Sequence, residues 1–344
     1  MPTTTPRELG YRMPAEWFPH AATWLSWPRP DGLSFPGRYE EVLPALGELV
    51  RAIAPHEAIH INVRNDDVES IARRTVGERE ANVFYHRIPS CEPWCRDHGP
   101  IFVTRAKELA VVDWGYNAYG RKYLPYDDDD AVPQRVADLL KLPLFSPGIV
   151  LEGGSLDVNG LGSLLTTTSC LLNPNRNPHL TQPQIKQYLR DYLGVSNVLW
   201  LGGGIAGDDT DGHVDNLARF VNPTTVVTVV EPDPHDVNYQ PLRENRKRLQ
   251  TMRDQDGQPL RVVELPSPGR VEYDGRRLPA SYANFYIANN VVVLPTYRNP
   301  ATDKAALDTL QTLFPDRRVV GIDSTSLIWG LGSFHCLTQQ QPAV

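Results

Sequence analysis

Four short motifs supply a thiol, an imidazole and carboxylates, which are the groups that covalent catalysis uses. The thiol is Cys336, close to the end of the chain in GLGSFHCLTQQ. The imidazole is His213 in TDGHVDN, two residues before Asp215, and further carboxylates are Asp97 in WCRDHGP and Glu152 in LEGGSLD. A thiolate is a strong nucleophile, and an imidazole transfers protons near neutral pH. The set therefore indicates chemistry at a cysteine, supported by an acid–base group and by acids that bind cations.

Each of these residues also has a simpler structural explanation. A free cysteine such as Cys336 often behaves only as a small buried hydrophobic residue. A His-x-Asp pair occurs in solvated loops and as an isolated pair of metal ligands. Asp97 could pair with Arg96 or begin a turn, and Glu152 could lie in a surface turn. The motifs gain weight only in combination.

Local patterns suggest how the groups would be presented. If residues 212–216 enter the strand predicted for Leu217–Val221, His213 and Asp215 would point to the same face, because side chains alternate along a strand. Near the cysteine, Gly330 and Gly332 are expected to let a ligand approach the backbone closely.

In combination, and together with MPAEWFPHAATWLSWP near the N-terminus, these motifs resemble the agmatine deiminase branch of the guanidino-group-modifying (pentein) superfamily, which includes bacterial-type peptidyl-arginine deiminases. The resemblance extends from about Met13 to Gln341. It implies an α/β fold: a five-bladed propeller of ββαβ units around a central polar cavity. The whole chain, residues 1–344, would then be a single catalytic domain.

The resemblance implies a role for each motif. Asp97 and Asp215 would clamp a guanidinium group, since a carboxylate can accept two parallel N–H bonds from it. Cys336 would attack the guanidinium carbon, and His213 would transfer protons to ammonia and from water. Glu152 would contact the guanidino group and orient His213, and Trp94 would form part of the pocket wall. Agmatine would thus be hydrolysed to N-carbamoylputrescine and ammonia through a thiouronium intermediate, with no metal and no cofactor.

Other functions remain open at this stage. Peptidyl-arginine or free arginine could be the substrate of the same chemistry, and a protein of this fold could be a non-catalytic binding protein. A thiol protease also needs Cys, His and Asp, although not the further carboxylates. Three residues depart from the motifs usual in agmatine deiminases, namely Leu331, Phe334 and Asp211. They bear on the fit of the pocket.

The elements that must position these groups alternate along the chain. Apolar runs predict strands, and apolar residues at three- and four-residue spacing predict helices. The predicted strands are Ala58–Val63, Asn82–Ile88, Leu109–Trp114, Asn197–Gly202, Val226–Val230 and Asn289–Pro295. The predicted helices are Glu40–Ala54, Asp66–Val76, Val132–Lys141, Gln182–Leu193, Gln240–Arg253 and Asp303–Phe314. The Pro- and Gly-rich stretch Glu264–Pro279 is expected to be a loop or hairpin within the fold.

Polar residues beside strand-like runs recur at intervals of about 50 to 75 residues, which is typical of a propeller-like repeat. Six such positions would fit on five units if the two ends of the chain complete one unit together. The positions are Trp24, Asp97, Glu152, His213, Asn284 and Cys336.

The composition of the chain limits the classes of molecule that it can be expected to bind. A net charge of −7 without a Lys/Arg run argues against nucleic acid and is compatible with a small cationic substrate. No apolar stretch of 18 or more residues or secretion signal occurs, so we expect a cytoplasmic protein with no membrane partner. Four cysteines in 344 residues are too few for a disulfide scaffold. Cys91 and Cys95 lack a second ligand pair for zinc, and Asp127–Asp130 is expected to be a solvated loop. No nucleotide-binding motif occurs, and homo-oligomer formation stays open.

Overall fold

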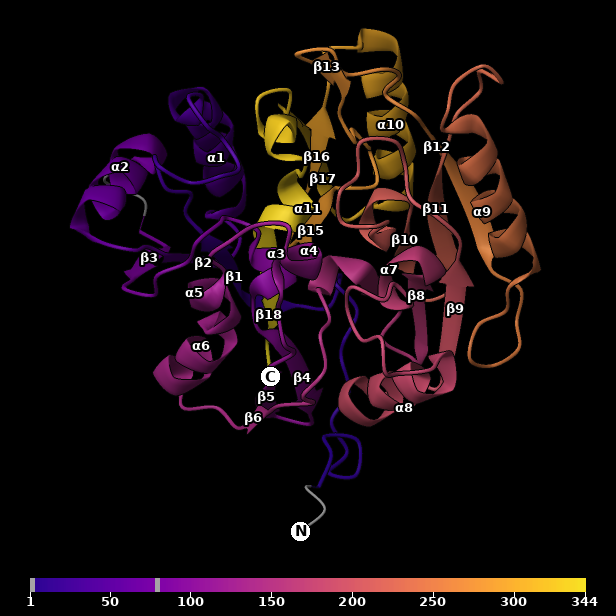
Figure 1. The fold of residues 1–344 in the computed structure, drawn as a ribbon, viewed down its shortest axis with the longest axis horizontal. Helices are drawn as coiled ribbons and strands as arrows, with labels where there is room; N and C mark the ends of the chain where they lie inside the picture. The colour runs from indigo at the N-terminus through magenta and orange to yellow at the C-terminus, as the bar shows by residue number, and fades with distance from the viewer. Residues whose placement is uncertain (1–3, 78–80) are drawn as a thin grey trace.

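The computed structural model describes residues 4–77 and 81–344. Within these residues, five sheets of three or four strands lie around a group of short central helices (Figure 1). The first sheet has the order β18(Thr338–Pro342), β1(His20–Ser26), β2(Ala58–Asn62), β3(Val83–His86). The others are β4(Ile101–Arg105), β5(Glu108–Val112), β6(Leu144–Phe145); β7(Leu156–Val158), β8(Ser163–Thr167), β9(Asn197–Leu201); β10(Ala218–Asn222), β11(Thr225–Val230), β12(Arg261–Pro266); and β15(Tyr286–Ala288), β16(Val291–Thr296), β17(Arg318–Asp323).

The sheets repeat one arrangement of strands. Two strands pair antiparallel, and a third, reached through a helical connection, joins them in parallel, as in β10, β11 and β12. A parallel partner requires such a crossover, whereas an antiparallel partner needs only a short turn. The alternation of strands and helices predicted from the sequence is therefore confirmed.

The two ends of the chain meet in one sheet. Strand β1 pairs antiparallel with β18, with Trp24 opposite Gln339. The indole Nε1 of Trp24 also donates to Oε1 of Gln341 at 2.9 Å. Residues more than 300 positions apart thereby form one unit.

The long helices lie toward the outside and the short ones near the middle (Figure 1). The long helices are α1(Tyr39–Ile53), α2(Asp66–Val76), α6(Val132–Leu140), α8(Gln182–Leu193), α9(Tyr239–Thr251) and α10(Pro300–Leu313). The short helices are α3(Cys95–His98), α4(Ala118–Arg121), α5(Asp127–Asp130), α7(Thr168–Leu171) and α11(Phe334–Leu337), with 3₁₀ turns η1(Gly153–Ser155), η2(Val214–Asn216) and η3(Leu327–Gly330).

Capping residues fix the ends of the outer helices. Helix α8 begins at a capping box in which Thr181 and Gln184 satisfy each other's backbone amides, and it ends at Gly194 in the left-handed region. Its apolar face, Ile185 and Leu189, is buried. Each fully buried aliphatic side chain contributes roughly 1.5–3 kcal/mol relative to exposure. The predicted bounds of α2 and α8 are the observed ones, and the other helices differ by up to three residues.

The stretch Glu264–Pro279 contains the hairpin of β13(Glu272–Tyr273) and β14(Arg276–Arg277), after β12 has ended. The hairpin agrees with the prediction, whereas residues 264–266 at the start of the stretch are still part of β12.

The prediction of a solvated loop at Asp127–Asp130 was wrong. These residues form α5, and the carboxylate of Asp129 is buried, where its Oδ1 accepts the backbone N–H of Cys91 at 2.6 Å. The short helix thus ties residues 91 and 92, which precede α3, to the segment that contains Tyr116.

Over the described residues, no helix is both long and apolar enough to cross a membrane. The longest of the helices given above, α1, has 15 residues, whereas a span needs about 20.

Candidate active site

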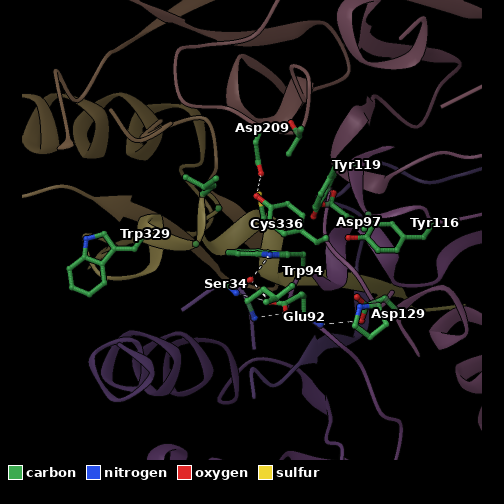
Figure 2. A pocket seen from close by; sticks show the side chains of 18 residues that line it. Ser34, Glu92, Trp94, Asp97, Tyr116, Tyr119, Asp129, Asp209, Trp329 and Cys336 are labelled. Carbon is green, nitrogen blue, oxygen red and sulfur yellow. Dashed lines mark hydrogen bonds between the residues drawn. The ribbon is translucent and has the colours of Figure 1, made fainter. Parts of the chain in front are cut away.

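Two short central helices bring the predicted nucleophile and one predicted acid to the same cavity. Helix α3 carries Asp97 and ends at His98, two residues before β4, while α11 carries Cys336 directly before β18. A cavity of about 70 Å³ is lined by both side chains, and Figure 2 shows them with Trp94. The side chains of His213, Glu152 and Asp215 are fully buried behind this lining.

Asn284 holds the cysteine in place. Its Nδ2 donates to Sγ of Cys336 at 3.1 Å, and its Oδ1 accepts the backbone N–H of His335 at 3.1 Å and that of Cys336 at 3.3 Å. The sequence pointed to Asn284 only as one of the regularly spaced polar residues. No local motif gave it a function, because its partners lie 51 and 52 residues away.

Acidic neighbours keep the thiol of Cys336 protonated in the free site. Burial raises its pKa first, and the carboxylates of Asp215 and Asp97 raise it further, so that it lies well above the ordinary value. Oδ2 of Asp215 is 3.6 Å from Sγ. A cation bound between these carboxylates would offset their charge and favour the thiolate.

Asp97 is held by two donors that leave it facing the cavity. Its Oδ1 accepts the backbone N–H of Gly154 at 2.9 Å, and its Oδ2 accepts the hydroxyl of Tyr119 at 2.8 Å. Burial raises the pKa of Asp97 to about 6. The simpler explanation, a pair with Arg96, does not hold, because that guanidinium bonds to Gln340 at 2.6 Å and to Glu16 at 3.3 Å.

The expected strand geometry at His213 was wrong, although its consequence holds. His213 precedes the 3₁₀ turn η2, and the strand begins only at Ala218. The tight turn still brings His213 and Asp215 together: a side-chain carbon added at Gly154 would lie 2.6 Å from His213 Nδ1 and 3.1 Å from Asp215 Oδ2. Gly154 is therefore required by the crowding of the functional groups around it.

His213 lies between two carboxylates. Its Nδ1 is 3.5 Å from Oδ1 of Asp97, and its Nε2 is 3.9 Å from Oε2 of Glu152. Burial lowers the pKa of His213, but the charge of Asp97 and contacts with Cys170 and Glu152 outweigh it and hold that pKa well above the ordinary value. In the free site the ring is therefore an imidazolium that can act as an acid.

Several buried atoms at this point lack a hydrogen-bond partner among the residues that the structure describes. They include both ring nitrogens of His213 and Oδ1 of Asp215. An unsatisfied buried polar group costs about 1–3 kcal/mol, so native proteins keep few of them. Such atoms indicate where a polar ligand would bind.

Arg176 fixes Glu152. Its Nε donates to Oε1 of Glu152 at 2.5 Å, and both side chains are fully buried. Burial alone would raise the pKa of Glu152, but the guanidinium outweighs it and the pKa lies below the ordinary value. Arg176 also bonds to Asp211 at 2.6 Å, and Lys122 pairs with Asp211 at 2.9 Å. Asp211, one of the residues that differ from the usual agmatine deiminase motifs, thus helps to hold Arg176 and does not line the cavity.

The two glycines before the cysteine make room for an aromatic ring, and both also line the cavity, which is compatible with the expected close approach of a ligand. A side-chain carbon at Gly332 would lie 2.5 Å from the Trp94 ring, and one at Gly330 would lie 2.9 Å from it. Trp94 is buried and its Nε1 donates to Ser34 Oγ at 3.0 Å, so it forms a wall as expected. Of the other departures, Leu331 lines the cavity, whereas Phe334 is buried in the core.

Glu152, Cys170 and His213 offer ligand atoms within 4.8 Å of one another. A metal ion there would have to compete with the guanidinium of Arg176 for Glu152 and displace a proton from His213. The donor set therefore fits an acid–base group better than a metal centre.

The lining of the cavity is acidic and aromatic. Its ionisable members among the described residues are acids, tyrosines and the thiol, with no Lys, Arg or His. The acids are Glu92, Asp97, Asp129 and Asp209, and the aromatic walls include Trp94, Tyr116, Tyr119 and Trp329 (Figure 2). Tyr123 also lines the cavity.

The mixed α/β fold, shared with a solved agmatine deiminase, is that of the guanidino-group-modifying superfamily of enzymes. More specifically, residues 12–342 match the Porphyromonas-type peptidyl-arginine deiminase family, and the chain belongs to this family. Membership makes it a hydrolase of guanidino C–N bonds.

Full-length relatives agree with this assignment. The chain is 38% identical over 367 residues to the agmatine deiminase of Pseudomonas aeruginosa, covering 99% of this chain and 98% of the relative. It is 37% identical to that of Ectopseudomonas mendocina, with the same coverage. The solved agmatine deiminase of Enterococcus faecalis superposes with a TM-score of 0.93 at 34% identity, covering 100% of this chain and 99% of that one.

Proposed function

We propose that this enzyme hydrolyses agmatine to N-carbamoylputrescine and ammonia through a covalent intermediate on Cys336. The observation that carries the proposal is the cavity that ends at this thiol, which is lined by four carboxylic acids and, among the described residues, by no basic side chain. Relatives named as agmatine deiminases over the full chain support it.

The lining distinguishes between the candidate guanidino substrates. Agmatine carries a guanidinium and an ammonium group and no carboxylate, so both of its ends are attracted to acids. Free arginine would bring an α-carboxylate into the same acidic surroundings without a cation to pair with it, which costs binding energy. Peptidyl-arginine is the second candidate because the family carries that name. Its peptide chain would have to pass the walls formed by Trp94, Trp329 and the tyrosines.

The first half of the reaction forms a bond between Sγ and the guanidinium carbon. The cation binds between Asp97 and Asp215, and the Cys336 thiol loses its proton to solvent as their charge is offset. The thiolate adds to the carbon, and the His213 imidazolium gives its proton to the departing nitrogen. Ammonia leaves, and a positively charged S-alkylthiouronium remains on Cys336, with His213 neutral.

The second half adds water. Neutral His213 takes one proton from the attacking water, whose oxygen bonds to the thiouronium carbon. The C–S bond then breaks, its electrons return to sulfur, and the second proton of the water is released to solvent, where it balances the ammonium formed from the ammonia that left earlier. Glu152, held by Arg176, orients the ring of His213 throughout. The ureido group of the product is neutral, so this end is no longer attracted by the two aspartates, while the ammonium at the other end of the molecule is unchanged.

We also propose an overall architecture and a cellular compartment for the enzyme. The five sheets would be the blades of a propeller, with the two chain ends closing one blade and residues 1–344 forming one catalytic domain. Four free cysteines and a small cationic substrate support a cytoplasmic enzyme. Homo-oligomer formation stays a proposal that sedimentation of the purified protein would test.

A direct comparison of substrates tests the function. Ammonia release is measured with agmatine, free arginine and an N- and C-terminally blocked arginine peptide, with Cys336→Ala as the background control. We expect kcat/KM to be highest for agmatine by a wide margin. An equal or higher kcat/KM for free arginine or the peptide would overturn the substrate, whereas no ammonia from any of them would overturn the function.

A further inference from the structure

We propose that Glu16 and His335 are positioning residues: Glu16 holds His335 as an imidazolium, and His335 keeps Asp215 ionised with one carboxylate oxygen free for the substrate. The inference rests on the proposed function for the role of Asp215. Neither Glu16 nor His335 lines the cavity. They would act on the reaction only through Asp215.

Hydrogen bonding at both ring nitrogens carries the argument. Nδ1 of His335 is 2.7 Å from Oδ2 of Asp215, and Nε2 is 2.8 Å from Oε2 of Glu16. An ionised carboxylate can only accept hydrogen bonds, and a neutral imidazole has one N–H. Both contacts are hydrogen bonds between ionised carboxylates and the ring only if the ring carries two protons.

Both carboxylates are held in the ionised form. Burial would raise the pKa of Glu16, but Arg219, at 2.8 Å, leads the charges that hold it well below the ordinary value. Arg96 contributes at 3.3 Å. Burial likewise opposes ionisation of Asp215, yet its pKa lies below the ordinary value, and the bond from His335 is the largest of the opposing effects.

The charges of the buried side chains around His335 also favour an imidazolium at this residue. The acids are Glu16, Asp215 and Asp157, and Asp157 bonds to Arg219 and accepts the backbone N–H of Phe220 at 3.0 Å. The permanent cations are Arg96 and Arg219, and the Cys336 thiol faces Asp215. Three acids against two guanidinium groups leave one net negative charge among buried side chains. An unpaired buried charge is costly, and an imidazolium at His335 removes it.

The contact between His335 and Asp215 determines how Asp215 can bind the guanidinium of the substrate. Oδ2 of Asp215 is occupied by His335, whereas Oδ1 is buried without a partner among the described residues, so it can accept an N–H of the guanidinium. When the product has left, the thiolate regains its proton because its pKa lies well above the ordinary value. Asp97 and Asp215 then face each other as like charges, which would otherwise favour protonation of one of them. The imidazolium prevents this at Asp215, and the site stays ready for the next cation.

Nitrogen-15 NMR of histidine-labelled enzyme without substrate tests the protonation state. In the wild type near pH 7.5 we expect one ring with two N–H protons that is identified as His335 by its loss in His335→Asn. In Glu16→Gln the same ring should carry a single N–H at that pH. A His335 ring with one N–H in the wild type would overturn the proposal, and this result does not depend on which substrate the enzyme uses.

Kinetics with agmatine tests the positioning. Glu16→Gln and His335→Asn should each lower kcat/KM roughly 10–100-fold, the effect of one charge-assisted hydrogen bond. Each should also shift the acidic limb of the pH profile to higher pH and make it steeper, because Asp215 then titrates as well. The double variant should lose little more than either single one, since both act through one contact.

Glu57→Gln is the matched control. Glu57 is a buried glutamate that pairs with His20 at 3.0 Å in the same way, and neither residue lines the cavity. Its replacement should leave the acidic limb in place. If Glu16→Gln and His335→Asn lower activity or stability but also leave the limb in place, the pair is only structural and the proposal fails.

Discussion

The hydroxyl of Tyr119 donates a hydrogen bond to Oδ2 of Asp97 at 2.8 Å, and both side chains line the cavity. This bond favours the ionised carboxylate, whereas burial and the neighbouring acids disfavour it, and the balance places the pKa of Asp97 at about 6. A donor from helix α4 thus tunes an acid on helix α3. The pair gives the pH dependence of the reaction a specific origin.

The first prediction concerns that pH dependence. Binding a guanidinium needs ionised Asp97, so kcat/KM for agmatine should fall as the pH drops through about 6. Tyr119→Phe removes a bond that lowers the pKa, so the acidic limb should move to higher pH, by about one unit for a charge-assisted hydrogen bond. Tyr282→Phe, which breaks a Tyr–Asp303 bond away from the cavity, is the control and should leave the limb unchanged. A limb unaffected by Tyr119→Phe would show that another group sets it.

Replacing the nucleophile should abolish turnover. In Cys336→Ala, ammonia release from agmatine should fall to the background of the assay, because the sulfur provides the covalent route. Circular dichroism and thermal unfolding should show a folded protein. Cys91→Ala, which removes another buried thiol, should keep most of the activity. Substantial turnover by folded Cys336→Ala would exclude the assigned nucleophile.

His213→Ala should separate the two halves of the reaction. Activation of water should slow by about 10²–10⁴-fold, the usual contribution of a positioned acid–base group. Attack by sulfur can continue more slowly, since the bound guanidinium itself favours the thiolate. Intact-protein mass spectrometry after mixing with agmatine should then reveal an adduct on Cys336 with the mass of agmatine less ammonia. Normal turnover without an adduct would exclude His213 as the group that activates water. An unmodified, inactive protein would show that His213 is already needed for the adduct to form.

Chelators should not affect the reaction. Glu152, Cys170 and His213 are close enough for a metal, but Arg176 already pairs with Glu152. Activity with agmatine should be the same before and after exhaustive treatment with EDTA. A loss that zinc then restores would reveal a metal centre in this cluster.

The buried pair of Arg176 and Glu152 should matter for stability. Arg176→Met leaves Glu152 as an unpaired buried charge, and such a loss costs about 3–5 kcal/mol of unfolding free energy. Arg298→Met removes the exposed partner of Asp323 and should cost less than about 1 kcal/mol. Urea unfolding of both variants measures the difference. Equal, small losses would show that Glu152 becomes protonated or solvated at little cost.

Much of this protein could be predicted from its sequence because the signals are local. Helices α2 and α8 have their predicted bounds, since an apolar face and a capping residue are both encoded within a few positions. The residues of the candidate site, Cys336 and His213 among them, could likewise be proposed from short motifs. The aspartates at 127–130 were mistaken for a loop because one of them is buried by donors from another segment.

The tertiary structure decided how the groups meet. His213 and Asp215 share a site through a 3₁₀ turn rather than through strand alternation. Tyr119 and Arg176 could not have been chosen as supports from their local sequence. The same holds for the bond between Glu16 and His335, which joins residues 319 positions apart. The residue types and their spacing in the sequence indicate which residues can take part in chemistry. Their burial, their hydrogen-bond partners and hence their pKa values arise only from contacts that folding creates between distant segments.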